Sequence, residues 1–316
     1  MIAANVLGFA VLASCLGSRW LPTARWTYRA PRLGIAAWYV LLATLVLSVL
    51  AVALSVVVPS ALRPPVVCAV LLWCVHSVGG GIGTAVRVGG DIVSATVLLA
   101  GVTFVVRCGL RLRAQVRDRR AHNEVLTLVG RVDHALGGVT VLDHAQPAAY
   151  VSPGRSPRVV VTTAAIRQLT PTQLAAVLGH ERAHAAGRHQ ILLDVVRVAA
   201  AAMPRARVFA AAQQQIARLI EIRADDVATR RHAPQDLAEA LAAMVAGAPV
   251  APAGVTAAHG GSAVERLHRL LDPPRPLHRA VAAGIVAAVA ALPATPLAIL
   301  VLCSSLPGLV RCVQLG

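Results

Sequence analysis

One short segment of the sequence combines residue types and a spacing that are suited to metal chemistry. His180-Glu181-Arg182-Ala183-His184 is an H-E-x-x-H motif. Side chains four residues apart lie on one face of a helix, so the two imidazoles can bind one metal ion. Glu181 lies beside them, where its carboxylate can accept a proton from a water molecule that the metal polarises. We therefore predict a metal-dependent hydrolytic site that uses one zinc ion.

The residues before this motif carry the signals of a helix start. Thr170-Pro171-Thr172-Gln173 supplies a capping hydroxyl, a proline in the first turn and a glutamine three residues after the cap. Apolar residues continue from Leu174 to Leu178, and Gly187 is a typical helix terminator. We predict a helix from Thr170 to about Gly187, with the motif in its second half.

A zinc site that keeps one position for water needs a third protein ligand. A second helical pattern after Pro204 leads to Glu221 and Asp225, which are again four residues apart. One carboxylate can ligate the metal while the other hydrogen-bonds a ligating imidazole. The alternative is a solvated acidic turn whose charges pair with neighbouring arginines. The H-E-x-x-H helix upstream favours the metal site.

Three short β-rich runs precede the predicted helix. They cover residues 138–142, 148–151 and 158–162, and turn-forming prolines and glycines separate them. The last run has two interpretations. Val159, Val160 and Val161 form either the edge strand that pairs with an extended substrate peptide or a plain structural strand.

The composition of the chain indicates a membrane protein. Apolar residues make up 57% and charged residues 14%, whereas a soluble domain averages about 45–50% and 25%. Four apolar stretches approach the length of about 20 residues that a bilayer crossing needs. They cover residues 1–17, 34–58, 92–106 and 280–302. The shorter run Val66–Val78 is expected to lie at the interface or to re-enter the membrane.

Arginine placement predicts the orientation of these spans. Arginines cluster in the loop after the first apolar stretch and again directly after the third. The positive-inside tendency assigns both clusters to the cytoplasm, which four spans satisfy and five do not. We expect the amino terminus outside the cell membrane and the loop after the third span inside it. Residues 1–108 then form a membrane region with three transmembrane helices and an external or re-entrant segment near 59–90. Residues 109–279 form a cytoplasmic catalytic domain, and residues 280–316 the fourth transmembrane helix with a short external tail.

The net charge of +16 leaves nucleic-acid binding to be considered. Only 3% of the residues are aromatic, and the sequence contains no zinc finger or recognition-helix pattern. We therefore expect no direct binding to nucleic acid. The expected partners are the lipid bilayer and a protein or peptide substrate.

The region from about Arg120 to Leu271 resembles the BlaR/MecR-type membrane metallopeptidases. These are related to the HtpX-like and CAAX-prenyl-type proteases among the gluzincins. The residues that carry the resemblance are Val141-Leu142 to Tyr150-Val151, Pro157–Thr163, Leu174–His184, Gly187-Arg188-His189 and Glu221–Asp226. The resemblance implies an α-helical multi-pass membrane protein with a zincin-like (gluzincin) α+β metalloprotease domain. It further implies that His180, His184 and Glu221 ligate zinc, that Glu181 is catalytic, and that Asp225 supports the site.

The resemblance also suggests groups that stabilise the oxyanion of the transition state. In CAAX-prenyl-type enzymes a His-Pro-Pro element shortly before an arginine-containing helix supplies such groups. Here His259-Gly260-Gly261 precedes Glu265-Arg266-Leu267, so His259 and Arg266 are the candidates, although both prolines are missing. His189, nine residues after His180, is expected on the surface or against a ligand rather than on the metal itself.

These observations together predict an integral-membrane zinc endopeptidase. By resemblance we expect it to act in transmembrane signalling by cleaving a cytosolic regulator, such as a transcriptional repressor. The best-known relatives sense β-lactams through an extracellular domain after the last span, but only a short segment follows Leu302 and no S-x-x-K element is present. A direct antibiotic-receptor role is therefore not expected. Two alternatives stay open: a membrane quality-control protease, and a non-catalytic transducer that retains the fold.

Overall fold

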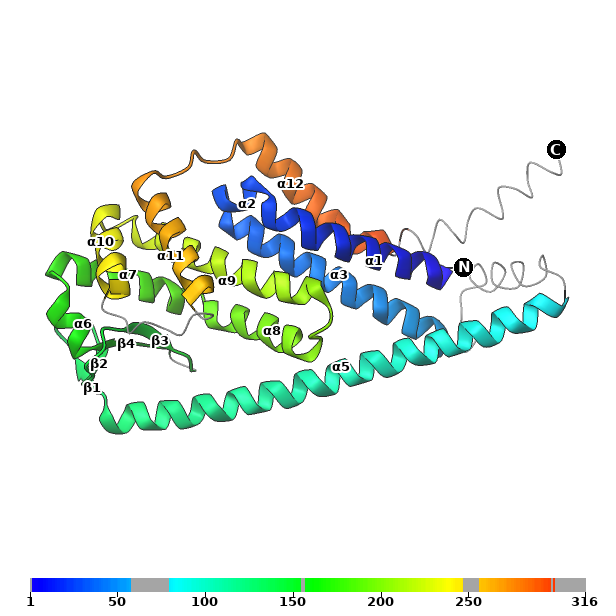
Figure 1. The fold of residues 1–316 in the computed structure, drawn as a ribbon, viewed down its shortest axis with the longest axis horizontal. Helices are drawn as coiled ribbons and strands as arrows, with labels where there is room; N and C mark the ends of the chain where they lie inside the picture. The colour runs from blue at the N-terminus through cyan, green and yellow to red at the C-terminus, as the bar shows by residue number, and fades with distance from the viewer. Residues whose placement is uncertain (1, 58–79, 155–156, 247–255, 297, 299–316) are drawn as a thin grey trace.

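The computed structural model describes residues 2–57, 80–154, 157–246, 256–296 and 298. The chain is mostly helical with one small sheet (Figure 1). Its helices are α1 (Ile2–Trp20), α2 (Arg25–Arg29), α3 (Pro31–Val57), α5 (Gly80–Val129), α6 (Thr163–Gln168), α7 (Pro171–Ala186), α8 (His189–Ala202), α9 (Arg207–Ala228), α10 (Pro234–Ala246), α11 (Thr256–Leu271) and α12 (Arg279–Ala291). Its strands are β1 (Arg131–Asp133), β2 (Val139–Leu142), β3 (Ala149–Ser152) and β4 (Arg158–Thr162), and 3-10 turns occur at Leu21–Thr23 (η1) and Leu292–Ala294 (η3).

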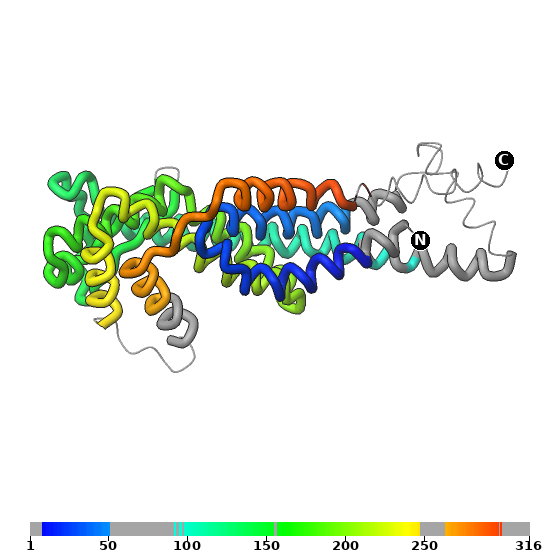
Figure 2. Tube along the Cα trace, turned by 90° about the horizontal axis from the view of Figure 1, so that it is seen from above, coloured from blue at the N-terminus to red at the C-terminus, as the bar shows by residue number. Residues whose placement is uncertain are grey.

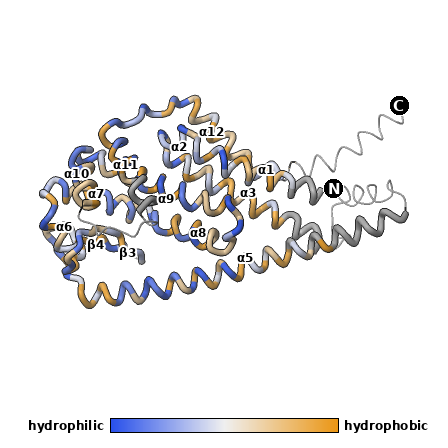
Figure 3. The backbone as a smooth tube through the Cα atoms, in the orientation of Figure 1, coloured by the Kyte–Doolittle hydropathy of each residue, from blue (hydrophilic) through white to orange (hydrophobic). Residues whose placement is uncertain are grey.

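The molecule is elongated, with the sheet at one end and apolar helices at the other. Figure 1 shows α6, α7 and α10 around the sheet, α1, α3 and α12 side by side at the opposite end, and α8 and α9 between them. The view from above shows the same division (Figure 2). Helix α5 runs along the whole molecule, and apolar colours predominate where it passes the apolar helices (Figure 3).

The sheet has the strand order β1-β2-β4-β3. β4 pairs in parallel with β2 and antiparallel with β3, so it is an inner strand. Val160 and Val161 are fully buried within it. The prediction that Val159, Val160 and Val161 form an edge strand is therefore wrong, because both hydrogen-bonding edges of β4 are already used inside the sheet. The edges of the sheet are β1 and β3.

The described residues contain one helical stretch that is long and apolar enough to cross a membrane. It is Pro31–Leu50 in α3, with a mean hydropathy of 2.3. Helices also lie in the other three predicted spans, which α1, α5 and α12 cover in large part. The apolar helix at Arg279–Ala294 is shorter than a full membrane crossing needs. The multi-pass topology therefore stays a prediction. Val66–Val78 lies outside the described residues.

The predicted boundary between residues 108 and 109 falls in the middle of α5, which is 50 residues long and continuous. The polypeptide thus enters the predicted catalytic domain along one unbroken helix. The division into domains itself stays a prediction.

Two hydrophobic cores hold the helices that carry the motif residues. The first joins α1 and α3 to α8 and α9, with Trp38 and Leu219 among its fully buried side chains. Gly34 lets α3 and α9 approach closely, because a Cβ there would lie 2.8 Å from Leu219 Cδ1. The second core joins the sheet to α7, α10 and the end of α11.

Candidate metal centre

The helix α7 brings the first three site residues together, and it forms as the sequence predicts. Thr170 is its N-cap and shares a reciprocal capping box with Gln173, and Gly187 is its C-cap. The i, i+4 spacing then places His180 and His184 on one face, with their Nε2 atoms 3.0 Å apart. The imidazole of His180 is buried.

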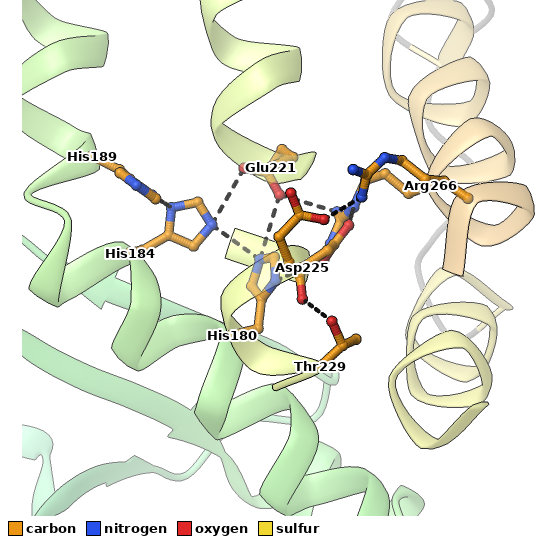
Figure 4. A network of polar contacts seen from close by, with 9 residues as sticks. His180, His184, His189, Glu221, Asp225, Thr229 and Arg266 are labelled. Carbon is orange, nitrogen blue, oxygen red and sulfur yellow. Dashed lines mark hydrogen bonds and ion pairs between the residues drawn. The ribbon is translucent and has the colours of Figure 1, made fainter. Parts of the chain in front are cut away.

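The helix α9 supplies the carboxylate that meets these imidazoles (Figure 4). Glu221 Oε2 lies 3.5 Å from His180 Nε2, and Glu221 Oε1 lies 3.6 Å from His184 Nε2. The Glu221 side chain is 36% exposed, so the cluster is open to solvent on this side. The structure therefore brings together all three residues that the sequence nominated as metal ligands.

The donor atoms of this cluster fit a zinc ion. One ligand atom each of His180, His184 and Glu221 lies within 4.8 Å of the others, so the three side chains could hold a metal ion. Two imidazole nitrogens at about 2.0–2.1 Å from a tetrahedral zinc would be about 3.3 Å apart, close to the 3.0 Å observed here. Two imidazoles and one carboxylate also leave the fourth position of a catalytic zinc site for water.

Both imidazoles of the cluster have partners on their far nitrogens. His180 Nδ1 lies 2.9 Å from Asp225 Oδ1 on α9. His184 Nδ1 lies 3.1 Å from His189 Nδ1 at the start of α8. Such contacts fix the orientation of a metal-binding ring. His189 is buried. It was expected either on the surface or against a ligand, and the structure places it against the candidate ligand His184.

Arg266 reaches the same cluster from α11. Its Nε and Nη2 donate to the two carboxylate oxygens of Asp225 at 2.8 and 2.7 Å, and its Nη1 lies 3.0 Å from Glu221 Oε2. Arg266 was predicted to stabilise an oxyanion, and here its guanidinium holds two carboxylates of the site. Its predicted partner His259 lies in α11 at a position where side chains are outside the described residues. No local spacing could reveal the pairing of Arg266 with Asp225, because 41 residues separate them.

The inner-strand valines lie apart from this cluster. Val161 packs in the second hydrophobic core, and Val159 packs against it. The strand predicted to bind substrate is therefore structural, which is the alternative interpretation of the sequence.

Burial and close charges shift the protonation of the α7 residues. Burial would lower the pKa of His180, but hydrogen bonds to Asp225 and Glu221 raise it to about 9. Burial lowers the pKa of His184 to about 4 and raises the pKa of Glu181 to about 7. Without a metal ion, His180 therefore carries a proton between two carboxylates at neutral pH, and Glu181 titrates in the range that suits a general base.

The two α9 carboxylates stay ionised. Burial would raise the pKa of both Glu221 and Asp225, but hydrogen bonds from His180 and the positive charge of Arg266 lower both to about 2. The ionised carboxylate is the form that binds a metal ion. Both carboxylates are therefore ionised over the physiological pH range, and Glu221 is in the form that can bind a cation.

A comparison with protein families identifies this arrangement. The model of peptidase family M48 matches residues 115–274, which include every described residue of the cluster. The chain belongs to peptidase family M48. Members of this family are metallopeptidases and are typically zinc-dependent, in agreement with the donor set of the cluster. No solved structure matches the chain.

The M48 match confirms the predicted metallopeptidase family in general terms. It begins within α5 and ends just after α11, so it includes the sheet and both helices that carry the ligands. The helices α1 and α3 lie outside the matched residues, although α3 packs directly against α9. The finer resemblance to BlaR/MecR-type proteins is part of the proposal below.

Proposed function

We propose that this M48 peptidase is an integral-membrane zinc endopeptidase of the BlaR/MecR type. The observation that carries the proposal is the meeting of His180 and His184 on α7 with Glu221 on α9, beside the H-E-x-x-H glutamate. In this proposal the three side chains hold one zinc ion. Asp225 orients His180, and His189 orients His184.

In this proposal, different side chains of the site have different roles in peptide hydrolysis. Zinc, when bound, acts as a Lewis acid that lowers the pKa of water and polarises a carbonyl oxygen. Glu181 has a pKa of about 7, so it can take a proton from the attacking water and pass it to the leaving amine. The single positive charge of Arg266 offsets part of the negative charge of Glu221 and Asp225 and holds both carboxylates in place. The exposed side of Glu221 gives the substrate access from solvent.

The edge strand β3 is the better candidate for substrate pairing. It pairs with β4 on one side only, and it packs against α7, which carries the H-E-x-x-H motif. An extended peptide could add to this edge by backbone hydrogen bonds, a common mode of peptide recognition. In this proposal the peptide pairs with Ala149–Ser152 in place of the valines of β4.

The proposed location is the cell membrane, with the amino terminus outside and the catalytic domain in the cytoplasm. The apolar stretch of α3 and the arginine clusters that flank the predicted spans support this topology.

The proposed role is transmembrane signalling through cleavage of a cytosolic regulator such as a transcriptional repressor. Substrate profiling separates this role from membrane quality control, because signalling gives one cytosolic substrate and quality control gives many membrane fragments.

The test uses the full chain purified in detergent. Zinc content and hydrolysis of an unstructured protein are measured for the wild type, Glu181→Gln and His184→Ala. We expect one zinc per chain and peptidase activity in the wild type. Glu181→Gln should keep its zinc and lose about 10³-fold in kcat, within the usual range for a general base, whereas His184→Ala should lose both zinc and activity.

Two results would contradict the proposal. A wild-type chain that binds no zinc would remove the metal site. Unchanged proteolysis in Glu181→Gln would remove the assigned catalytic role and favour a non-catalytic transducer.

A further inference from the structure

Helix α11 is fastened to α9 by three arginine–carboxylate pairs. The pairs are Arg218–Glu265, Arg266–Asp225 and Arg269–Asp226. Those of Arg218 and Arg266 place two guanidinium nitrogens on the two oxygens of one carboxylate, the geometry in which such pairs are strongest and most directional. Besides the apolar contacts of Leu267 and Leu270 in the second core, these charged contacts hold α11 to α9, and one of them belongs to the metal centre.

An aromatic side chain from the amino-terminal region lies between the two outer pairs. The Tyr28 ring, on the short helix α2, has the Arg218 guanidinium 5.5 Å from its centroid and that of Arg269 at 5.3 Å. Both distances are within the range of cation–π attraction. The Tyr28 hydroxyl donates to the Glu265 carbonyl at 3.4 Å, and Arg269 Nη2 donates to the Tyr28 carbonyl at 3.4 Å. We call Tyr28, Arg218, Glu265 and Arg269 the Tyr28 clasp.

The clasp and the metal centre share the same short piece of helix. Arg266 directly follows Glu265 and precedes Arg269 by three residues, less than one helical turn. Because a helix moves as a unit over so short a distance, a shift of α11 away from α9 would also withdraw Arg266. Arg266 holds Asp225 through two hydrogen bonds and lies 3.0 Å from Glu221. Both carboxylates contact His180.

We propose that Tyr28 is a positioning residue of the metal centre. By filling the space between Arg218 and Arg269 it holds α11 against α9, and through Arg266 it fixes the carboxylates that bind and orient the metal ligands. Tyr28 lies three residues before the first residue of α3, which carries the candidate membrane span. The segment between α1 and α3, which contains α2, thereby controls how tightly the site holds its metal ion. This inference rests on the proposed zinc site.

The experiment measures metal affinity in the full chain. Zinc affinity is obtained by competition with a chromophoric chelator, and the ligand field is followed by the visible absorption of the Co²⁺-substituted protein. Tyr28→Ala should lower zinc affinity roughly tenfold, the lower end of the effect of removing a direct partner of a ligand. The Co²⁺ absorption should change as well. Tyr28→Phe keeps the ring between the two guanidiniums, so its affinity should stay within about twofold of the wild type.

A matched control separates positioning from general loss of packing. Phe104→Ala removes another half-buried ring, which packs on Phe209 of α9 at a centroid distance of 5.9 Å and belongs to the first hydrophobic core. It should lower the melting temperature and leave zinc affinity and the Co²⁺ spectrum unchanged. Arg269→Gln serves as a second clasp variant that leaves the Tyr28 ring in place. It should lower zinc affinity several-fold, and it tests the proposal even when Tyr28→Ala cannot be purified in folded form.

The inference is overturned if the clasp variants bind zinc as tightly as the wild type, or if Phe104→Ala weakens zinc binding as much as Tyr28→Ala. In both cases the wild-type chain still binds zinc, and the proposed function stands. A wild-type chain that binds neither zinc nor Co²⁺ contradicts the proposed function itself, so the two failures are distinguishable.

Discussion

The two hydrophobic cores of the molecule contribute opposite halves of the metal centre. The second core holds the sheet and α7, and α7 presents His180, Glu181 and His184. The first core holds α1, α3, α8 and most of α9, and α9 presents Glu221 just after the core residue Ile220. The centre therefore lies where two separately packed regions meet, and its geometry depends on both.

The amino-terminal helices matter for the site because they pack on α9, which carries Glu221. The end of α9 also reaches the second core through Ala228, so α9 belongs to both cores. A rigid helix that spans two cores couples their stability. We therefore expect the two cores to unfold together in a single cooperative transition.

The largest effect is expected from removing a buried side chain of the first core. Trp38→Ala empties a fully buried position and should lower the free energy of unfolding by about 3–5 kcal/mol. Leu178→Ala, in the second core, should cost about 2–5 kcal/mol. Thermal unfolding of both variants in detergent should give one transition. A Trp38→Ala protein that melts in two steps, with zinc released only in the upper one, would show that the cores are independent.

The next largest effect is expected from removing the carboxylate that α9 contributes. A binding free energy of about 10–16 kcal/mol for structural zinc sites with four ligands gives roughly 2.5–4 kcal/mol for each ligand. Glu221→Ala should therefore weaken zinc binding about 100- to 1000-fold, and His184→Ala, from α7, should have a similar effect. Chelator competition measures both. Wild-type affinity in Glu221→Ala would mean that α7 binds the metal without α9.

In the metal-free protein, acid should weaken the contact between Asp225 on α9 and His180 on α7. The pKa of Asp225 is lowered from its ordinary value of 3.8 to about 2, so its stabilising contribution is present above pH 4 and is lost as the pH falls toward 2. His180 is protonated in both the folded and the unfolded chain below pH 5. Its titration therefore does not contribute to the change in stability between pH 5 and pH 2. We expect Asp225 to account for a loss of about 2 kcal/mol between pH 5 and pH 2, and Glu221, whose pKa is also lowered to about 2, adds to the loss in the same direction. Denaturant unfolding in chelator checks this, and a profile for Asp225→Asn as steep as that of the wild type would contradict it.

The smallest effect is expected from a change at the solvent-exposed start of α7. Thr170→Ala removes the hydroxyl that caps α7 and should lower the free energy of unfolding by about 1 kcal/mol. Zinc affinity should not change, because the cap lies ten residues from His180. Thr170→Ser, which keeps a capping hydroxyl, is the matched control. Equal destabilisation by both substitutions would assign the loss to the methyl group of threonine rather than to the cap.

Sequence reasoning was most successful where the controlling interactions are local. The capping box of Thr170 and Gln173, the end of α7 at Gly187 and the shared face of His180 and His184 all depend on residues within one or two helical turns. The strand segments are local too, and β2, β3 and β4 coincide closely with the predicted runs. The short β1 was missed, because it has only three residues and directly follows α5.

It was least successful where strand order or a distant charge decides the outcome. The valines of β4 read equally well as an edge or an inner strand, and only the pairing with β2 and β3 makes them inner. The sequence suggested a catalytic contact for Arg266 by resemblance. The fold turns its guanidinium toward Asp225 and Glu221, and the contact with an oxyanion stays a prediction.

The sequence by itself determined the chemistry of this protein: the two imidazoles, the glutamate between them and the acidic pair downstream, since helical periodicity fixes what lies on one face. The tertiary structure alone decided which carboxylate meets the imidazoles, which arginine balances it, and that Tyr28 reaches α11 from the far end of the chain. The physical reason is that these contacts join residues tens to hundreds of positions apart. Their geometry follows from how the two cores pack against each other rather than from any local pattern.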